Sequence, residues 1–180
     1  MGHDLHLPNG SAPTAAATVL HPHPGMGGDR HHPLVVALAE GLAGAGVAAL
    51  RLDLPDPDVT RSTAALVAAM DDLAASQGAD RRLLVGYSWG AAVTANAEVP
   101  GLSARVLVAP PVTMLDLDPR PEPTLVLVPA HDQYGPPEAA VEAMAAWPDA
   151  TVEVVEGCDH FLAGAVDRIA TRAVAWLVTT

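Results

Sequence analysis

Short apolar runs alternate with longer alanine-rich stretches along most of the chain. The runs are a few residues long and carry β-branched side chains, as expected of strands buried on both faces. The alanine-rich stretches favour helices, and the last has apolar positions along one face. We therefore predict strands at residues 15–21, 47–52, 83–85, 104–109, 124–129 and 151–155. We predict helices at residues 29–45, 61–76, 91–97, 137–147 and 163–177.

This alternation predicts an α/β fold. Right-handed crossovers between successive strands produce a mostly parallel sheet that is covered by helices on both faces. We expect a single domain over residues 1–180, a three-layer α/β/α sandwich with a sheet of about 6–7 strands. Residues 1–13 contain the turn signal Pro8-Asn9-Gly10 and are expected either to add a short edge strand or to remain loosely ordered.

The segment Gly86-Tyr87-Ser88-Trp89-Gly90 lies where the third predicted strand gives way to a helix. A strand that turns sharply into a helix leaves little room for Cβ atoms, which accounts for the two glycines. The Trp89 N–H, at the positive end of the helix dipole, then faces any oxyanion formed at Ser88. The pattern predicts a nucleophilic serine; the alternative is an ordinary turn in which Ser88 only caps the helix.

A nucleophilic serine needs a histidine to accept its proton and a carboxylate to orient that histidine. Asp132 follows the fifth predicted strand, and His160 follows the sixth, so both reach the sheet edge where Ser88 lies. Three other carboxylates could take the place of Asp132, and they are Asp116, Asp118 and Asp159. We expect Asp132, because Asp159 is too close in sequence to His160 and the other two precede the fifth strand.

The order Ser88, Asp132, His160 is that of the α/β-hydrolases, and residues 17–178 resemble a small member of that group. The stretch His-Pro-His-Pro-Gly-Met-Gly-Gly at 21–28 is similar to the loop after an early strand in lidless bacterial hydrolases related to dienelactone hydrolase. The resemblance implies the α/β-hydrolase fold without a lid domain.

The 21–28 loop is expected to complete an oxyanion hole. A backbone N–H near His23 or Gly25 would complement that of Trp89. Two departures from the related hydrolases stand out. Those proteins commonly have Arg-Gly-x-Gly-x-Ser after the next strand, where this chain has the acidic, proline-rich segment 53–58. Dienelactone hydrolase resembles a version of this site with cysteine at the elbow. In this chain serine occupies the elbow, and Cys158 lies elsewhere and is expected to be a small buried apolar side chain.

Histidines near the predicted strand ends raise the question of a metal site, and they are His21, His23, His31, His32 and His131. A His-x-His pair at a strand end is a familiar ligand arrangement. An amidohydrolase barrel needs about 250 residues, more than this chain has. The metallo-β-lactamase motif His-x-His-x-Asp-His fails as well, because its aspartate position is Gly25. We therefore expect neither a metal nor another cofactor.

Composition argues against nucleic-acid and membrane partners. The net charge of −12 and the scattered nine Lys and Arg residues oppose nucleic-acid binding. No apolar run reaches the ~20 residues of a membrane span, and residues 1–17 lack the features of a signal peptide, so we expect a cytoplasmic protein without a membrane partner. The oligomeric state stays open. Aromatic residues are scarce, yet Tyr87, Tyr134 and Phe161 adjoin the candidate catalytic positions and are expected to line a substrate pocket.

The expected activity is hydrolysis of a small ester or thioester through an acyl-enzyme on Ser88, with His160 as base and Asp132 stabilising the imidazolium. The short connection at 110–123 leaves no room for a helical lid, which favours an open pocket and small acyl groups over long lipids. Two alternatives remain: an idle scaffold that binds a ligand or partner, and an acyltransferase that uses the same triad.

Overall fold

The computed structural model describes residues 2–10, 12–55 and 57–180. The strands are β1 (His3–His6), β2 (Ala15–Leu20), β3 (Val47–Leu52), β4 (Arg82–Tyr87), β5 (Leu102–Val108), β6 (Thr124–His131) and β7 (Ala150–Asp159). The helices are α1 (Pro33–Gly44), α2 (Val59–Gln77), α3 (Trp89–Asn96), α4 (Pro137–Met144) and α5 (Val166–Thr179), with a short 3₁₀ helix η1 (Pro24–Met26).

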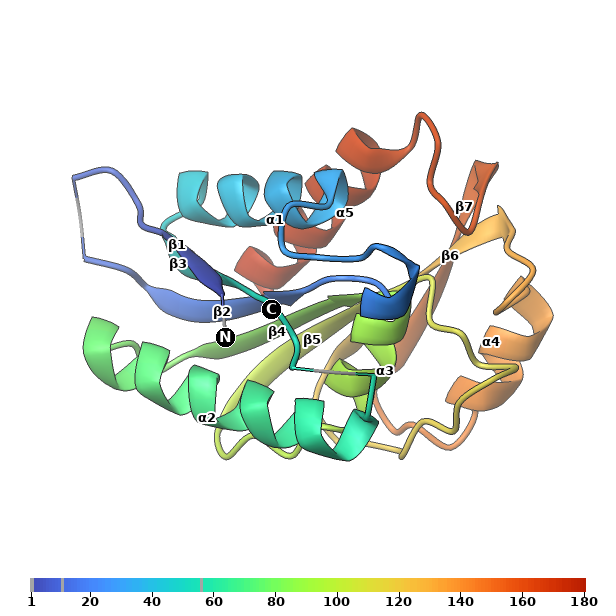
Figure 1. The fold of residues 1–180 in the computed structure, drawn as a ribbon, viewed down its shortest axis with the longest axis horizontal. Coiled ribbons are helices and arrows are strands. Elements are labelled where there is room, and N and C mark those ends of the chain that lie inside the picture. Colours follow the sequence, from blue (N-terminus) through green and yellow to red (C-terminus); the bar gives the residue numbers. More distant parts are fainter. Residues whose placement is uncertain (1, 11, 56) are drawn as a thin grey trace.

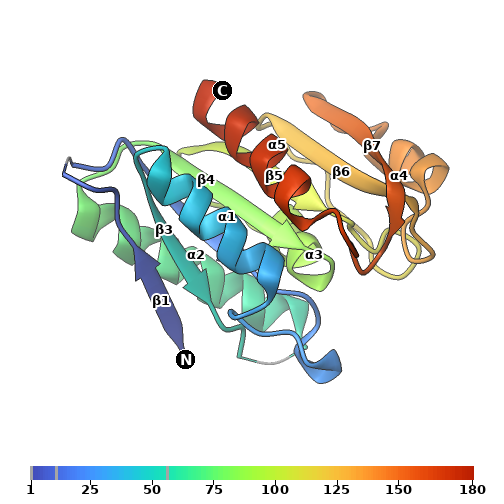
Figure 2. The ribbon, with the colours of Figure 1, turned by 90° about the horizontal axis from the view of Figure 1, so that it is seen from above.

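All seven strands form one sheet in the order β1-β3-β2-β4-β5-β6-β7. The edge strand β1 pairs antiparallel with β3, and every other neighbouring pair is parallel. Helices α1 and α5 cover one face of the sheet, while α2, α3 and α4 lie on the other (Figure 1; Figure 2). The predicted three-layer, mostly parallel fold is therefore confirmed, and the carboxyl ends of the parallel strands share one edge.

The core depends on small apolar side chains at the centre of the sheet. β2 is buried at every position, and its first three residues, Ala15 to Ala17, have 0% exposure. Residues 42 and 177 from α1 and α5 belong to the same core cluster, because alanines on the strands let both helices approach closely. Among the described helices, none is both long and apolar enough to cross a bilayer.

Some boundaries differ from those predicted by the sequence pattern. The first long helix begins at Pro33 and not at residue 29, because His32 occupies the N-cap position and proline suits the first helical turn. The region 1–13 does supply an edge strand, β1; residues 1 and 11 lie outside the described part. The last strand runs on to Asp159, so that it ends directly before His160.

A fully buried arginine holds the far end of α3, the helix that follows Ser88. Arg105 has 0% exposure, and its Nη1 donates hydrogen bonds of 2.9 Å to the backbone carbonyls of Thr94 and Ala95. Its Nη2 pairs with a Glu122 carboxylate oxygen at 2.7 Å. The cation thus lies against the negative end of the α3 dipole, while Ser88 lies at the positive end.

Candidate active site

Ser88 lies on a strained turn between β4 and α3. Its φ of 54° and ψ of −119° lie outside the conformations that residues with a Cβ readily adopt. The flanking glycines permit this turn. A Cβ on Gly86 would lie 2.2 Å from the carbonyl oxygen of Gly90, and one on Gly90 would lie 2.5 Å from that of His21. The sharp strand-to-helix turn predicted from the Gly-x-Ser-x-Gly pattern is therefore present.

The structure brings Ser88, His160 and Asp132 together at the carboxyl edge of the sheet. Ser88 Oγ lies 2.8 Å from His160 Nε2, and His160 Nδ1 lies 2.8 Å and 3.0 Å from the two carboxylate oxygens of Asp132. Asp132 Oδ1 also accepts hydrogen bonds from the backbone N–H groups of Tyr134 and Gly135. A proton on Nδ1 faces the carboxylate, which leaves the Nε2 lone pair to accept the proton of Ser88.

All three side chains of this network are buried, with residue exposures of 8% for Ser88, 5% for His160 and 3% for Asp132. The other candidate carboxylates lie elsewhere. Asp159 Oδ1 accepts the backbone N–H of Phe161, and the backbone N–H of Asp118 donates to Asn96 on α3. The 110–123 segment thus runs past the far end of α3 and does not present its acidic side chains to His160.

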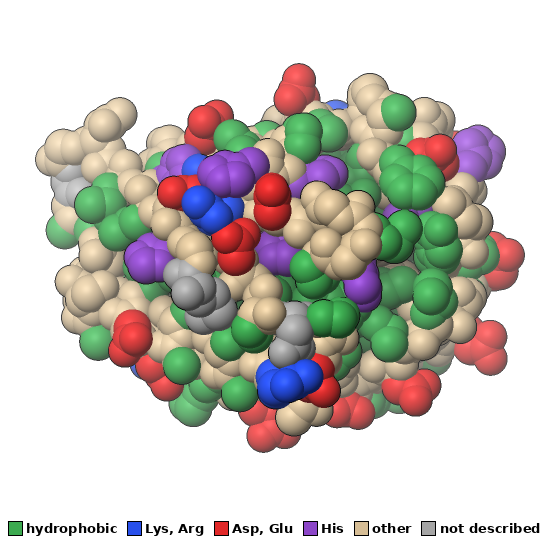
Figure 3. Space-filling view, viewed as in Figure 1, with side chains coloured by type: hydrophobic (Ala, Val, Ile, Leu, Met, Phe, Trp, Pro, Cys, Tyr) green, Lys and Arg blue, Asp and Glu red, His purple; other side chains and the backbone are tan. Residues whose placement is uncertain are grey.

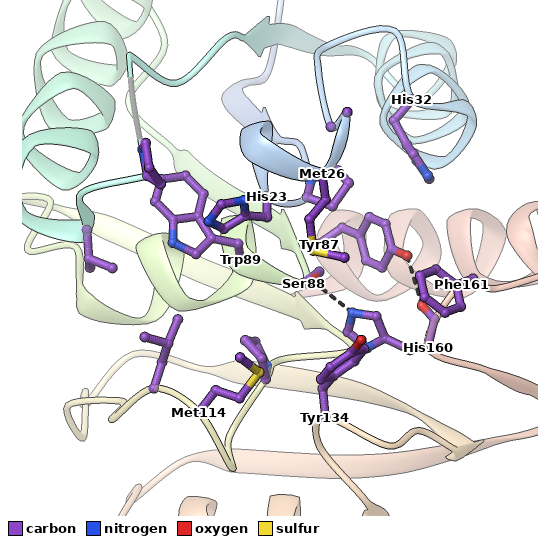
Figure 4. A pocket seen from close by; sticks show the side chains of 17 residues that line it. His23, Met26, His32, Tyr87, Ser88, Trp89, Met114, Tyr134, His160 and Phe161 are labelled. Carbon is purple, nitrogen blue, oxygen red and sulfur yellow. Dashed lines mark hydrogen bonds between the residues drawn. The ribbon is translucent and has the colours of Figure 1, made fainter.

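Aromatic rings enclose His160. Tyr134 and Phe161 meet its ring edge-to-face, with centroid distances of 4.7 Å and 5.7 Å. Tyr87 is nearly buried, and its hydroxyl donates a 2.8 Å hydrogen bond to the His160 carbonyl oxygen. Burial raises the pKa of Tyr87, so its hydroxyl stays protonated. The residues expected to line a pocket do so, and Tyr87 also fixes the loop that carries His160 (Figure 4).

Two backbone N–H groups near Ser88 have no acceptor of their own among the described residues. Trp89 is the first residue of α3, so its N–H has no acceptor within that helix. The N–H of Gly25 donates to Nδ1 of His23 at 3.0 Å and is therefore occupied. The His23 N–H has no backbone acceptor among the described residues. Of the two donors that the sequence left open, His23 is thus the available one.

A cavity of about 380 Å³ opens beside Ser88 and has largely apolar walls. Met26, Met114 and Phe161 stand at its mouth with exposures of 71%, 66% and 56%. On the face seen in Figure 3, apolar side chains gather on the right, and the few Lys and Arg side chains lie apart from them. The sequence did not predict that the methionines and His32 line the cavity, because the apolar pattern does not show which loop side chains turn toward a common cavity.

His21 has a hydrogen-bond partner at each ring nitrogen. His21 is buried. Its Nδ1 lies 2.6 Å from the Pro22 carbonyl oxygen, and its Nε2 accepts the Leu54 N–H at 2.9 Å. It thereby joins the loops that follow β2 and β3. Burial lowers the pKa of His21, which keeps the ring neutral for both hydrogen bonds. Segment 53–58 differs in sequence from the corresponding segment of the related hydrolases. Its Pro57 lines the cavity, and residue 56 lies outside the described residues.

No described group of three or more His, Cys, Asp or Glu side chains is arranged to hold a metal ion. Cys158 is buried at 5% exposure within the core cluster beneath α5, and its Sγ lies 3.4 Å from the Val155 carbonyl oxygen. Of these two side chains, Ser88 lines the cavity and Cys158 does not.

Sheet order, elbow and cavity together define the α/β-hydrolase fold, in a form where the residues between β5 and β6 contain no lid helix. Comparison with protein-family models and with curated proteins finds no match. Solved structures match closely in fold. A lidless α/β serine hydrolase from Xanthomonas campestris has a TM-score of 0.83 and 21% identity, over 95% of this chain and 85% of its own.

Two further structures extend this likeness. Dienelactone hydrolase from Anabaena variabilis has a TM-score of 0.79 and 22% identity, over 98% of this chain and 90% of its own. Est1E from Butyrivibrio proteoclasticus, with ferulic acid bound, has a TM-score of 0.84 and 16% identity, over 99% of this chain and 94% of its own. Structures described as esterases share the fold as well. The resemblance to lidless α/β serine hydrolases is confirmed at the level of the fold.

Proposed function

We propose that the protein is a serine hydrolase that cleaves small carboxylic esters or thioesters through an acyl-enzyme on Ser88. The observation that carries this proposal is the continuous hydrogen-bonded chain from Ser88 through His160 to Asp132, at an elbow that opens into an apolar cavity. A buried carboxylate next to an imidazole stabilises the imidazolium that forms when serine loses its proton.

The reaction follows from this geometry. Ser88 Oγ attacks the acyl carbonyl carbon while its proton passes to His160 Nε2, and the Trp89 and His23 N–H groups hold the oxyanion. The imidazolium then protonates the leaving alcohol or thiol, and the acyl-enzyme remains. His160 next removes a proton from water, which attacks the acyl carbon and releases the acid. Asp132 keeps its carboxylate charge throughout and receives hydrogen bonds from two backbone N–H groups.

The cavity supports a small acyl substrate. Its volume of about 380 Å³ is near the lower end of the range for small-molecule pockets. The fold likeness to a structure with ferulic acid bound favours a compact acyl group in the same way. The exposed mouth and the missing lid make the pocket open to small esters in solution.

The test is a panel of acyl esters, thioesters, amides and lactones, assayed with the wild type, Ser88→Ala, Asp132→Asn and Asp116→Asn. Loss of a triad member should lower turnover by roughly three orders of magnitude or more. Asp116→Asn is the matched control, because Asp116 lies outside the network, and it should keep wild-type turnover. Full short-chain esterase activity in Ser88→Ala would refute the proposal.

The idle-scaffold alternative makes a different prediction. A fluorophosphonate probe labels a serine only when a base activates it, so the wild type should be labelled at Ser88 and His160→Gln should not. An unlabelled wild type would favour a binding role. Products formed with added alcohols would show an acyltransferase that uses the same residues.

A further inference from the structure

A histidine outside the triad lines the cavity. His32 lies at the N-cap of α1 and reaches the cavity on the side of Tyr87, whose ring centroid is 5.0 Å from its own (Figure 4). It stands across the site from Trp89 and His23 (Figure 4). His32 takes no part in the proposed acyl transfer.

The hydrogen bonding of His32 fixes where its proton lies. The backbone N–H of Leu34 donates to His32 Nδ1 at 3.3 Å, so this nitrogen is the acceptor of the ring. A neutral imidazole with an acceptor Nδ1 carries its hydrogen on Nε2. Burial lowers the pKa of His32, in agreement with a neutral ring. Nε2 has no hydrogen-bond acceptor among the described residues, so this residue of the cavity wall carries an N–H donor without a protein partner.

Few polar side chains share the cavity wall with His32. One is His23, whose Nδ1 accepts the Gly25 N–H, and it lies on the other side of the site (Figure 4). The described lining residues include no Asp, Glu, Lys or Arg, and most are Pro, Met, Val, Leu or aromatic. In pockets of this kind a few polar groups orient the ligand, and apolar walls supply contact area. A half-buried donor gains free energy when a ligand oxygen meets it, and a charged ligand group would find no opposite charge among these residues.

We infer that His32 is a substrate-binding residue whose Nε2–H donates a hydrogen bond to an uncharged oxygen of the substrate, separate from the scissile carbonyl. The substrate class is accordingly an uncharged ester with a largely apolar body and one ether, hydroxyl or oxo oxygen. This inference rests on the proposed hydrolase function where it is tested by kinetics. A calorimetric test of binding does not need that function.

Two substitutions separate the donor from the helix cap. In His32→Asn, the side-chain amide overlaps the position of Nδ1, so it can still cap α1 but does not reach as far as Nε2. In His32→Gln, the amide nitrogen can take the place of Nε2 and restore the donor. His31→Asn is the matched control, because His31 is adjacent but does not line the cavity.

The substrates are phenyl alkanoates and alkyl acetates in which one methylene after another is replaced by an ether oxygen. The measured quantity is the ratio of kcat/KM for each ether ester to that for its all-carbon partner. At one oxygen position, this ratio should fall about five- to tenfold in His32→Asn, recover in His32→Gln and stay unchanged in His31→Asn. Identical ratios in the wild type and His32→Asn at every position would overturn the inference and leave His32 as a helix cap only.

A binding experiment tests the role of His32 separately from the proposed hydrolase function. The same esters are titrated into Ser88→Ala and Ser88→Ala/His32→Asn by calorimetry, where no turnover is needed. A wild type without esterase activity would refute the proposed function, yet the ether-to-alkyl affinity ratio would still decide the role of His32. A ratio that is equal in both variants would refute that role even in an active esterase.

Discussion

Ser88 holds a backbone conformation that a glycine would adopt more easily, and this has a measurable effect on stability. Its φ of 54° and ψ of −119° cost of order 1–3 kcal/mol for a residue with a Cβ. Ser88→Ala and Ser88→Gly both remove Oγ and its hydrogen bond to His160, so they differ only in the Cβ. Part of this strain relief is offset, because glycine loses about 0.5–1 kcal/mol more conformational entropy on folding than alanine does. We expect Ser88→Gly to be more stable than Ser88→Ala by about 1 kcal/mol in net strain relief.

A second pair of variants corrects for the ordinary preference at helix N-caps, where glycine already exceeds alanine. Asp58 caps α2 with an ordinary extended backbone, φ −88° and ψ 116°. Asp58→Gly and Asp58→Ala therefore measure the cap effect without strain. Ser88 makes no side-chain cap hydrogen bond, so cap loss does not enter the comparison at the elbow.

Urea unfolding, followed by circular dichroism, gives the free energies of unfolding of all four variants. The glycine-over-alanine difference at position 88 should exceed that at position 58 by about 1 kcal/mol, or about 2–4 °C in Tm for a chain of this size. Equal differences at the two positions would show that the elbow stores no strain. The reasoning about Ser88 would then be wrong, whatever the activity of the protein.

Three other predictions concern the framework around the site. Because burial lowers the pKa of His21 below the unfolded value of 6.5, the unfolded state binds protons more readily, and the free energy of unfolding should fall as pH drops below about 6.5. His21→Gln keeps an acceptor for Leu54, and its urea midpoint should fall less steeply with acid; an unchanged slope would contradict this. Arg105→Met leaves buried carbonyls and a carboxylate unpaired and should cost about 3–5 kcal/mol in urea unfolding, whereas a loss under 1 kcal/mol would show that the pair is dispensable. Gly135→Ala places a Cβ 2.2 Å from the Pro110 carbonyl oxygen and should lower both kcat and the urea midpoint by displacing the Asp132 loop; wild-type values would show that the loop adapts.

The sequence predicted the fold well because each strand has its own local signal. Buried parallel strands are apolar on both faces, so the runs at β2, β3 and β5 stand out without tertiary information. The proximity of Ser88, Asp132 and His160 was predictable for a related reason. Parallel strands end at one sheet edge, which brings Asp132 and His160 toward Ser88. The choice of Asp132 over Asp116 depended on the path of the 110–123 segment, which only the structure shows.

The walls of the cavity were less predictable. Met26, His32 and Met114 come from loops and a helix start, where side-chain direction depends on packing between segments distant in sequence. The residue types of His21 and His32 are those of metal ligands, but in the structure both imidazoles hydrogen-bond to backbone groups. Residue type alone could not separate these roles, because an imidazole nitrogen serves as metal ligand, cap and donor.

The hydrogen bonds among Ser88, His160 and Asp132 also make Ser88 a reporter of folding. The Ser88–His160 hydrogen bond joins residues 72 positions apart, and the His160–Asp132 hydrogen bonds span 28 positions. No local hairpin or helix pair contains the whole network, and non-local contacts are slow to form. Labelling of Ser88 during refolding would therefore register only molecules whose sheet has closed from β4 to β7, which makes the elbow a probe of the complete fold.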